Sequence, residues 1–258
     1  MYRQILLIFT LSIFGHTQYA KAQSSSLNTF KDEESTRFVY KKEWSGGATI
    51  NNRGFGAIVR YAIIPSNFMK IQFETELVKL KHSKEIKVVN PYYNNSKSYV
   101  YGKQNVFYPF RTGIGSQFLI FDKAAKDGVE VSGTIMGGMS WGLLKPVYLE
   151  VLKDSNNPFE PILVSEKFDK NLHDERNILG YSGFTKGLNE MKVVPGLYIK
   201  SGLNFDWGTK DDRIMCIETG VVVDYFFKEV PIMAEFQNIE NQNAFVSLYA
   251  TILFGKKY

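Results

Sequence analysis

The stretch 246–254, four residues before the last residue of the chain, reads VSLYATILF. Its side chains alternate in character: Val246, Leu248, Ala250, Ile252 and Phe254 share one parity, and Ser247, Tyr249 and Thr251 share the other. Because successive side chains of a β-strand point to opposite faces, this period of two predicts a strand with one apolar and one polar face. The run is also longer than the ~5–6 residues of an average strand.

Seven earlier segments repeat this pattern and are separated by clusters of Gly, Asn, Pro, Asp and Lys. With the last one, the expected strands cover 35–45, 54–64, 68–78, 104–116, 129–144, 191–207, 213–227 and 244–256. They reach the ~9–11 residues that a strand needs to cross a membrane, and bacterial single-chain barrels use an even number of strands.

The expected connections alternate in length along the chain. Shorter turns fall at 64–67, 118–128 and 208–212, whereas long connections cover 79–103, 145–190 and 228–243, with a short first loop at 46–53. Short periplasmic turns opposite long extracellular loops are typical of outer-membrane barrels. The sequence therefore predicts an all-β fold, an antiparallel up-and-down transmembrane β-barrel of about eight strands with long extracellular loops.

The N-terminal residues predict export. Arg3 precedes an apolar run at 5–14, and Ala20-Lys21-Ala22 forms an A-x-A cleavage site. The expected organisation is a signal peptide at 1–22, a flexible N-terminal lead-in at 23–34 and the barrel at 35–258. An amphipathic last strand followed by the terminal Tyr258 resembles the signal that outer-membrane assembly machinery reads. The expected location is thus the cell outer membrane.

One face of the expected strands carries charges of both signs. The expected lumen charge network consists of Arg60, Lys70, Glu74, Arg111, Lys200, Glu218 and Asp224, with Glu76, Glu130, Lys192 and Asp206 also placed inward. The lumen of an eight-stranded barrel is just wide enough for side chains to fill it, and an unpaired buried charge is costly. Acids and bases are therefore expected to pair and to close the lumen.

The opposite face is apolar and is expected to contact outer-membrane lipid. It includes Phe55, Ala57, Val59, Tyr61 and Ile63; Val106, Tyr108, Phe110 and Ile114; Val131, Ile135, Met139 and Trp141; Leu197, Ile199, Leu203 and Phe205; and Met215, Ile217, Val221 and Val223. Aromatic residues make up 15% of the chain, and their rings suit the interface girdles of such a barrel.

The sequence offers little for catalysis, cofactors or metals. His82 and His173 lie in separate expected loops, so a catalytic dyad or a shared metal site would rest on two residues without fixed spacing. The net charge of +5 is spread along the chain without a nucleic-acid-binding motif, and Cys216 is the single cysteine. We expect no enzyme activity, no cofactor, no metal and no nucleic-acid partner.

Two long loops are the candidate sites of partner binding. The first holds Tyr92, Tyr93, Asn94, Tyr99 and Tyr101, a Tyr/Asn-rich composition that gives rigid contact area and hydrogen bonds. The alternative is that these tyrosines extend the neighbouring strands and pack on one another. The second loop, 145–190, is expected to form its own hairpin near 147–151 and to dock a partner over the barrel mouth.

Several short runs share a pattern with known proteins: KEI at 84–86, NPYY at 90–93, YVYGK at 99–103, KPVYLE at 145–150, PGLY at 195–198, VPIMA at 230–234 and FGKK at 254–257. They resemble a small outer-membrane β-barrel family widespread in Bacteroidota. The resemblance spans most of the mature chain and implies a signal peptide, a barrel and the outer membrane. It implies no catalytic residues.

These observations leave three classes of function. The first is a non-enzymatic barrel that serves as a structural or accessory subunit of an outer-membrane assembly or secretion complex, with protein partners bound through its extracellular loops. The second is a small transport or porin-like barrel, against which the mixed charges of the lumen argue. The third is an outer-membrane enzyme that hydrolyses lipid or peptide.

Overall fold

The computed structural model describes residues 40–258 except 124–127, 154–161, 170–171, 175 and 236–240. The expected signal peptide, the lead-in and the first residues of the expected first strand lie outside the described residues. No helix among the described residues is long and apolar enough to cross a membrane.

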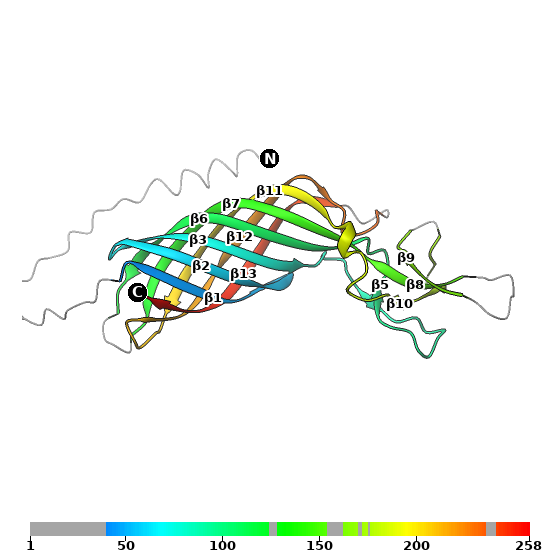
Figure 1. Cartoon of the computed structure of the whole chain (residues 1–258), viewed down its shortest axis with the longest axis horizontal. Coiled ribbons are helices and arrows are strands. Elements are labelled where there is room, and N and C mark those ends of the chain that lie inside the picture. The colour runs from blue at the N-terminus through cyan, green and yellow to red at the C-terminus, as the bar shows by residue number, and fades with distance from the viewer. Residues whose placement is uncertain (1–39, 124–127, 154–161, 170–171, 175, 236–240) are drawn as a thin grey trace, which may run out of the picture. The chain divides into compact units, whose positions relative to one another are not determined.

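Eight long strands form a closed barrel (Figure 1). They are β1 (Lys42–Asn51), β2 (Gly54–Ser66), β3 (Met69–Leu80), β6 (Asn105–Phe121), β7 (Glu130–Pro146), β11 (Lys192–Asp206), β12 (Arg213–Val230) and β13 (Gln242–Lys257). The order around the barrel is β1-β13-β12-β11-β7-β6-β3-β2, with antiparallel neighbours throughout, and β1 closes the ring on β13. Closure pairs the backbone groups of every strand, as a barrel in lipid requires. The predicted fold class is confirmed.

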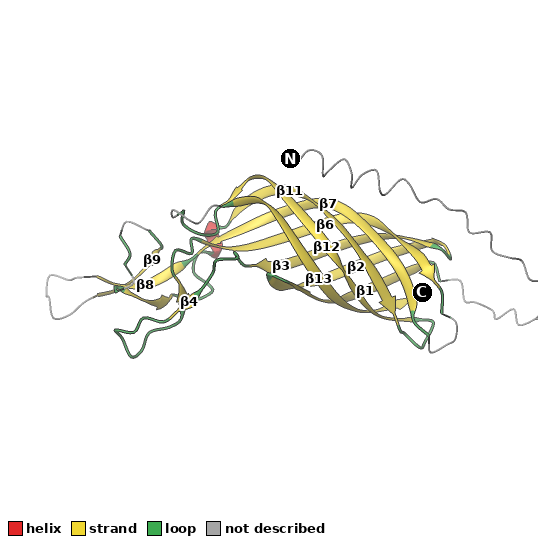
Figure 2. Cartoon of the chain, turned by 180° about the vertical axis from the view of Figure 1, so that it is seen from behind, coloured by secondary structure: helices red, strands yellow, loops and turns green. Residues whose placement is uncertain are grey.

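The two ends of the barrel differ. At the terminal end, where β1 begins and β13 ends, β2 joins β3 through the short turn at Asn67 and Phe68. The opposite end carries a head, the name used here for the described residues of 81–104 and 147–191 (Figure 2). The head contains β4 (Lys87–Val88), β5 (Tyr99–Val100), β8 (Tyr148–Lys153), β9 (Ile162–Lys167), β10 (Ile178–Tyr181) and the 3-10 turn η1 (Leu188–Glu190).

The head has its own small hydrophobic core. Strands β8, β9 and β10 form a three-stranded sheet in the order β10-β8-β9, and β4 pairs with β5. The buried side chains between them are Tyr99, Val147, Leu149, Val151, Phe168 and Ile178, joined by Val106 and Ala234 from the barrel and its last connection. Because this core includes barrel residues, the head is packed onto the barrel end.

The first strand differs from the expectation of 35–45 followed by a loop at 46–53. Strand β1 continues to Asn51, and only Asn52 and Arg53 separate it from β2. The adjacent Gly46 and Gly47, which suggested a loop, lie within the strand. At Gly47 a Cβ would lie 1.8 Å from the carbonyl oxygen of Ile252 in β13, so glycine there permits a close approach of the two strands.

The outer wall of the barrel is an apolar belt. Its exposed members include Phe55, Val59, Ile63, Ile114, Ile135, Met139, Leu197, Ile199, Leu203, Met215, Ile217 and Val221. Near the terminal end, aromatic rings continue across three strands, with Trp44 and Tyr61 centroids 5.0 Å apart and Tyr61 and Phe73 centroids 6.4 Å apart. Such a belt bordered by aromatic rings suits the hydrocarbon core and its interface.

Two side chains depart from the expected sorting of the faces. Val106 was expected to contact lipid, but it is 8% exposed because β6 begins at the head end, where the head core covers it. Lys192 was expected to point into the lumen, yet it is exposed. Strand β11 begins at Lys192, separated from the end of η1 by one residue, so this residue stands beyond the packed lumen.

Candidate functional site: the filled lumen and the head

The centre of the lumen holds a buried ion-pair network. Arg60 of β2 donates to Glu74 of β3 at 2.6 and 3.1 Å and to Glu218 of β12 at 2.7 and 3.0 Å. Lys200 of β11 donates to the second oxygen of Glu74 at 2.9 Å, and its ammonium lies 4.5 Å from the ring centre of Tyr249. The Tyr249 hydroxyl in turn donates to Glu218 at 3.0 Å. Side chains from β2, β3, β11, β12 and β13 thus meet in one network.

A second buried cluster is centred on Arg111 of β6. Its guanidinium donates to both carboxylate oxygens of Asp224 at 2.8 and 2.7 Å and to Glu76 at 2.9 Å. The hydroxyl of Ser140 also donates to Asp224, at 3.0 Å. Two bonds in parallel between a guanidinium and a carboxylate are among the strongest hydrogen bonds in proteins. The cluster therefore ties β6, β3, β7 and β12 together inside the barrel.

Lys70, also expected in the network, lies apart from these clusters. Its ammonium is 3.1 Å from the carboxylate of Glu43, near the start of β1, and it lies within electrostatic range of Glu130 and Asp206. Glu43 was not among the residues expected inward, since the first strand was misplaced. The structure thus brings six of the seven residues into two central clusters and places Lys70 in a separate pair at the terminal end.

An apolar plug fills the lumen at the head end. The rings of Phe107 and Phe226 have centroids 5.3 Å apart, and Phe245 lies 5.3 Å from the first and 5.9 Å from the second. Ile232 and Met233, from the connection between β12 and β13, are buried against the same cluster. The plug was missed from the sequence, although the inward parity of the three phenylalanines could have indicated it.

We expect purified protein in a planar bilayer to show no steady single-channel conductance. The plug residues Phe107, Phe226 and Phe245 are at most 2% exposed, and Arg60 and Arg111 below them are held by carboxylates. An ion crossing the lumen would have to pass both the phenylalanine plug and the ion-pair clusters. Current steps of uniform size at neutral pH would contradict this account of the lumen.

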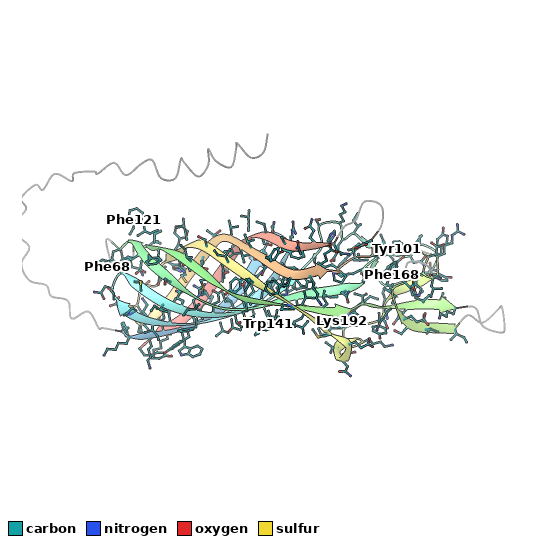
Figure 3. All side chains as sticks on the ribbon, turned by 90° about the horizontal axis from the view of Figure 1, so that it is seen from above. Phe68, Tyr101, Phe121, Trp141, Phe168 and Lys192 are labelled. Atoms are coloured by element: carbon teal, nitrogen blue, oxygen red, sulfur yellow. The ribbon has the colours of Figure 1, made fainter. Side chains whose placement is uncertain are left out.

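The Tyr/Asn-rich loop of the head divides into buried and exposed parts. Tyr99 is 4% exposed, and the ring of Tyr101 packs edge-on against Phe168 at 5.4 Å (Figure 3). In contrast, Tyr92 and Tyr93 are 65% and 38% exposed. Tyr99 and Tyr101 therefore pack within the head, as the alternative expected, whereas Tyr92 and Tyr93 at the loop tip are exposed.

The tip, defined as residues 91–95, includes the exposed Asn94 and is anchored at both ends to β10. The amide of Asn90 donates to the carbonyl of Ile178 at 2.7 Å, and the backbone N–H of Lys97 donates to the carbonyl of Leu179 at 2.9 Å. The Asn90 side-chain oxygen also accepts from the N–H of Tyr92 at 2.9 Å. A tip held this way presents its tyrosines at little further cost in conformational entropy.

The two histidines are engaged in the local structure of the head. Nδ1 of His173 accepts from the backbone N–H of Asp169 at 2.9 Å, and its Nε2 lies 3.7 Å from Glu166. A hydrogen bond from Lys153, assisted by His173, lowers the pKa of the Glu166 carboxyl. His82 accepts from the backbone N–H of Lys84 at 3.3 Å. The described residues contain no group of three or more His, Cys, Asp or Glu placed to hold a metal ion.

A closed antiparallel barrel with an apolar wall and a filled, charged lumen defines a transmembrane β-barrel of the outer-membrane type. Comparisons with protein-family models and with the sequences of curated proteins found no match.

Solved structures with a similar arrangement include several outer-membrane barrels. They include the N-terminal β-barrel domain of Pseudomonas aeruginosa OprF (TM-score 0.37, 7% identity, 85% of this chain and 98% of that one), Ail of Yersinia pestis (0.37, 8%, 85% and 99%) and neisserial surface protein A (0.36, 9%, 85% and 96%).

Proposed function

We propose that the chain is a non-enzymatic outer-membrane barrel that serves as a structural or accessory subunit of an assembly or secretion complex. In this proposal the barrel anchors the head in the membrane, and the tip with Tyr92, Tyr93 and Asn94 binds the protein partner. The observation that carries it is an exposed pair of tyrosines, on a loop tip hydrogen-bonded to β10 at both ends, in a head that stands over a filled lumen.

The chemistry of the tip supports a protein partner. Tyrosine offers a large apolar ring and a hydroxyl with few rotatable bonds, and it is enriched among the residues that dominate binding energy at interfaces. Ile86 and Val89, from the same loop, are 72% and 57% exposed and extend the apolar character of the surface. Contiguous exposed apolar surface is typical of interaction sites.

The alternatives have less support. A transport function needs a path through the lumen, and the plug of Phe107, Phe226 and Phe245 stands in that path. A hydrolase needs a base positioned beside a nucleophile, whereas Nδ1 of both His82 and His173 accepts a backbone hydrogen bond. These observations favour a binding role for the head.

The test is affinity purification of the tagged protein from its native outer membrane in gentle detergent, with quantitative mass spectrometry. Replacing both tip tyrosines, Tyr92→Ala and Tyr93→Ala, is expected to reduce the recovery of a stoichiometric partner strongly, since each hot-spot side chain contributes roughly 2 kcal/mol or more. The variant should still show the wild-type heat-modifiable mobility of a folded barrel.

The matched control is Ile162→Ala with Leu163→Ala, which removes two comparably exposed apolar side chains from β9, elsewhere on the head. This variant is expected to keep the partner. Equal recovery of all proteins by wild type and tip variant would reject the tip as the binding site, and a wild-type barrel that purifies alone would reject the subunit proposal.

A further inference from the structure

The outer wall of the barrel carries a second distinctive cluster just above the apolar belt. Lys79 follows the exposed Leu77 on the outward parity of β3, and Tyr108 follows Phe110 toward the head on the adjoining β6. On the next strand, Lys145 pairs with Val106 of β6. These side chains therefore lie at the head end of three neighbouring strands, where the wall passes from the hydrocarbon region to the lipid headgroups.

Lys145 is fully buried without a carboxylate partner. Its Nζ makes one hydrogen bond, to the hydroxyl of Tyr181 at 3.4 Å, and lies 5.0 Å from the ring centre of Phe184 and 5.9 Å from that of Tyr181. Among the described residues, no carboxylate forms an ion pair with the Lys145 ammonium. A buried cation compensated only by rings and a phenol is costly, and an anion at this place would relieve that cost.

The surroundings of Lys145 add positive charge. Lys79 repels it electrostatically, and Lys79 in turn lies within electrostatic range of Lys81, Lys87 and Lys103. The one acid in this set, Glu85, is already bound to Lys103 at 2.5 Å. A local excess of cations over carboxylates at the membrane surface attracts anionic headgroups.

Two phenols complete the site with neutral donors. Tyr108 and Tyr181 lie within electrostatic range of each other, and both are partly buried. Burial raises the pKa of the Tyr181 phenol, so its hydroxyl keeps its proton at neutral pH. Ammonium groups beside phenolic hydroxyls form a donor set that suits the oxygens of a phosphate.

We propose that Lys79 and Lys145, with the hydroxyls of Tyr108 and Tyr181, bind the phosphate of an anionic glycolipid headgroup in the outer leaflet. The inference rests on the barrel standing in the outer membrane with its head outside, and it is independent of protein binding by the tip. The phosphate of the headgroup pairs with Lys145, and the apolar belt below Lys79 contacts the acyl chains.

The ring of Phe184 covers the Lys145 ammonium and lies on a segment with unusual backbone freedom. Phe184 is 59% exposed and follows Gly183, which has φ +105° and open space around it. Gly187, with φ +81°, ends the same short segment. Two glycines in left-handed conformations give the segment backbone options that other residues lack. Displacement of the Phe184 ring by a headgroup therefore opens the ammonium to phosphate.

The test measures binding of lipid A to the purified full chain in detergent, by native mass spectrometry and by the rise in the unfolding temperature. Lipid A is expected to bind and to raise the unfolding temperature of the wild type. Lys79→Met and Lys145→Met together are expected to weaken binding by roughly tenfold or more. Lys210→Met, the same charge change in an exposed turn at the terminal end, is expected to leave binding unchanged.

Two other ligands and two single variants test whether the phosphate of the headgroup is what binds. Dephosphorylated lipid A and inorganic phosphate are both expected to bind at least roughly tenfold more weakly than lipid A. Equal binding of dephosphorylated lipid A, or equal stabilisation by inorganic phosphate alone, would overturn the headgroup assignment. If the double variant fails to fold, the single variants Lys79→Met, at a half-buried position, and Tyr181→Phe, which is isosteric, are measured in its place. Unchanged lipid A binding in both single variants would overturn the proposal. A wild-type barrel that retains lipid A but no protein would leave this site intact and reject the tip proposal instead.

Discussion

Val221→Arg is expected to prevent stable insertion of the barrel into lipid vesicles. Val221 lies near the middle of the outward-facing run of β12 and is 40% exposed on the apolar belt. An arginine at mid-bilayer on the lipid face costs ~2–4 kcal/mol, which is a large share of the ~5–15 kcal/mol by which proteins are stable. The measurement is the free energy of unfolding in vesicles by urea titration, together with heat-modifiable mobility on gels.

The control is Phe227→Arg on the same face of the same strand. Phe227 is 57% exposed and stacks edge-on near Tyr225 at 6.5 Å, at the head-end border of the belt. Because the cost of a charge falls to about 0–1 kcal/mol near the interface, this variant should insert. Equal effects at the two positions would contradict the placement of the belt in the bilayer.

Arg111→Met is expected to lower the free energy of unfolding by about 3–5 kcal/mol, because it leaves Asp224 buried without its cation and leaves Glu76 with only the more distant Lys200, at 3.8 Å. All three side chains are at most 1% exposed. Adding Asp224→Asn to Arg111→Met removes the carboxylate that lost its cation and should recover part of the loss. Urea unfolding of the three proteins in the same vesicles measures both effects.

The matched exposed pair is Lys97 with Glu150, whose ammonium and carboxylate lie 3.1 Å apart with the lysine side chain 64% exposed. Exposed ion pairs contribute about 0–1 kcal/mol, so Lys97→Met should be nearly neutral. A loss in Arg111→Met no larger than that in Lys97→Met would mean that the lumen clusters do not stabilise the barrel.

The period of two allowed most of the barrel to be predicted from the sequence. Parity decides which face a strand residue occupies, and this placed Arg60, Glu74 and Glu218 inward before any contact was known. Parity does not say at which level of the lumen a side chain stands. That level depends on how the tilted strands are staggered, which is why Lys70 meets Glu43 and not the central network.

Other features of the structure depend on tertiary packing, which the alternation of apolar and polar residues does not predict. Val106 has the parity of a lipid-facing residue, but the head covers it, and the sequence gives no measure of how far β6 extends beyond the membrane. Gly47 looks like a turn residue and serves instead the close approach of β1 and β13. The basic cluster around Lys145 was not predicted either, since Lys145 lies on another strand, more than 40 residues after Lys103 in the chain.

The most direct test of the central claim, that the head tip binds a protein partner, is photo-crosslinking in intact cells. A photoreactive amino acid placed at Tyr93 is expected to give one dominant crosslinked protein, whereas the same group at Leu172, an exposed head residue outside the tip, is expected to give none. Identification of a single crosslinked protein at Tyr93 would support the subunit function and name the process. Absence of a crosslink at Tyr93, or the same products at both positions, would contradict it.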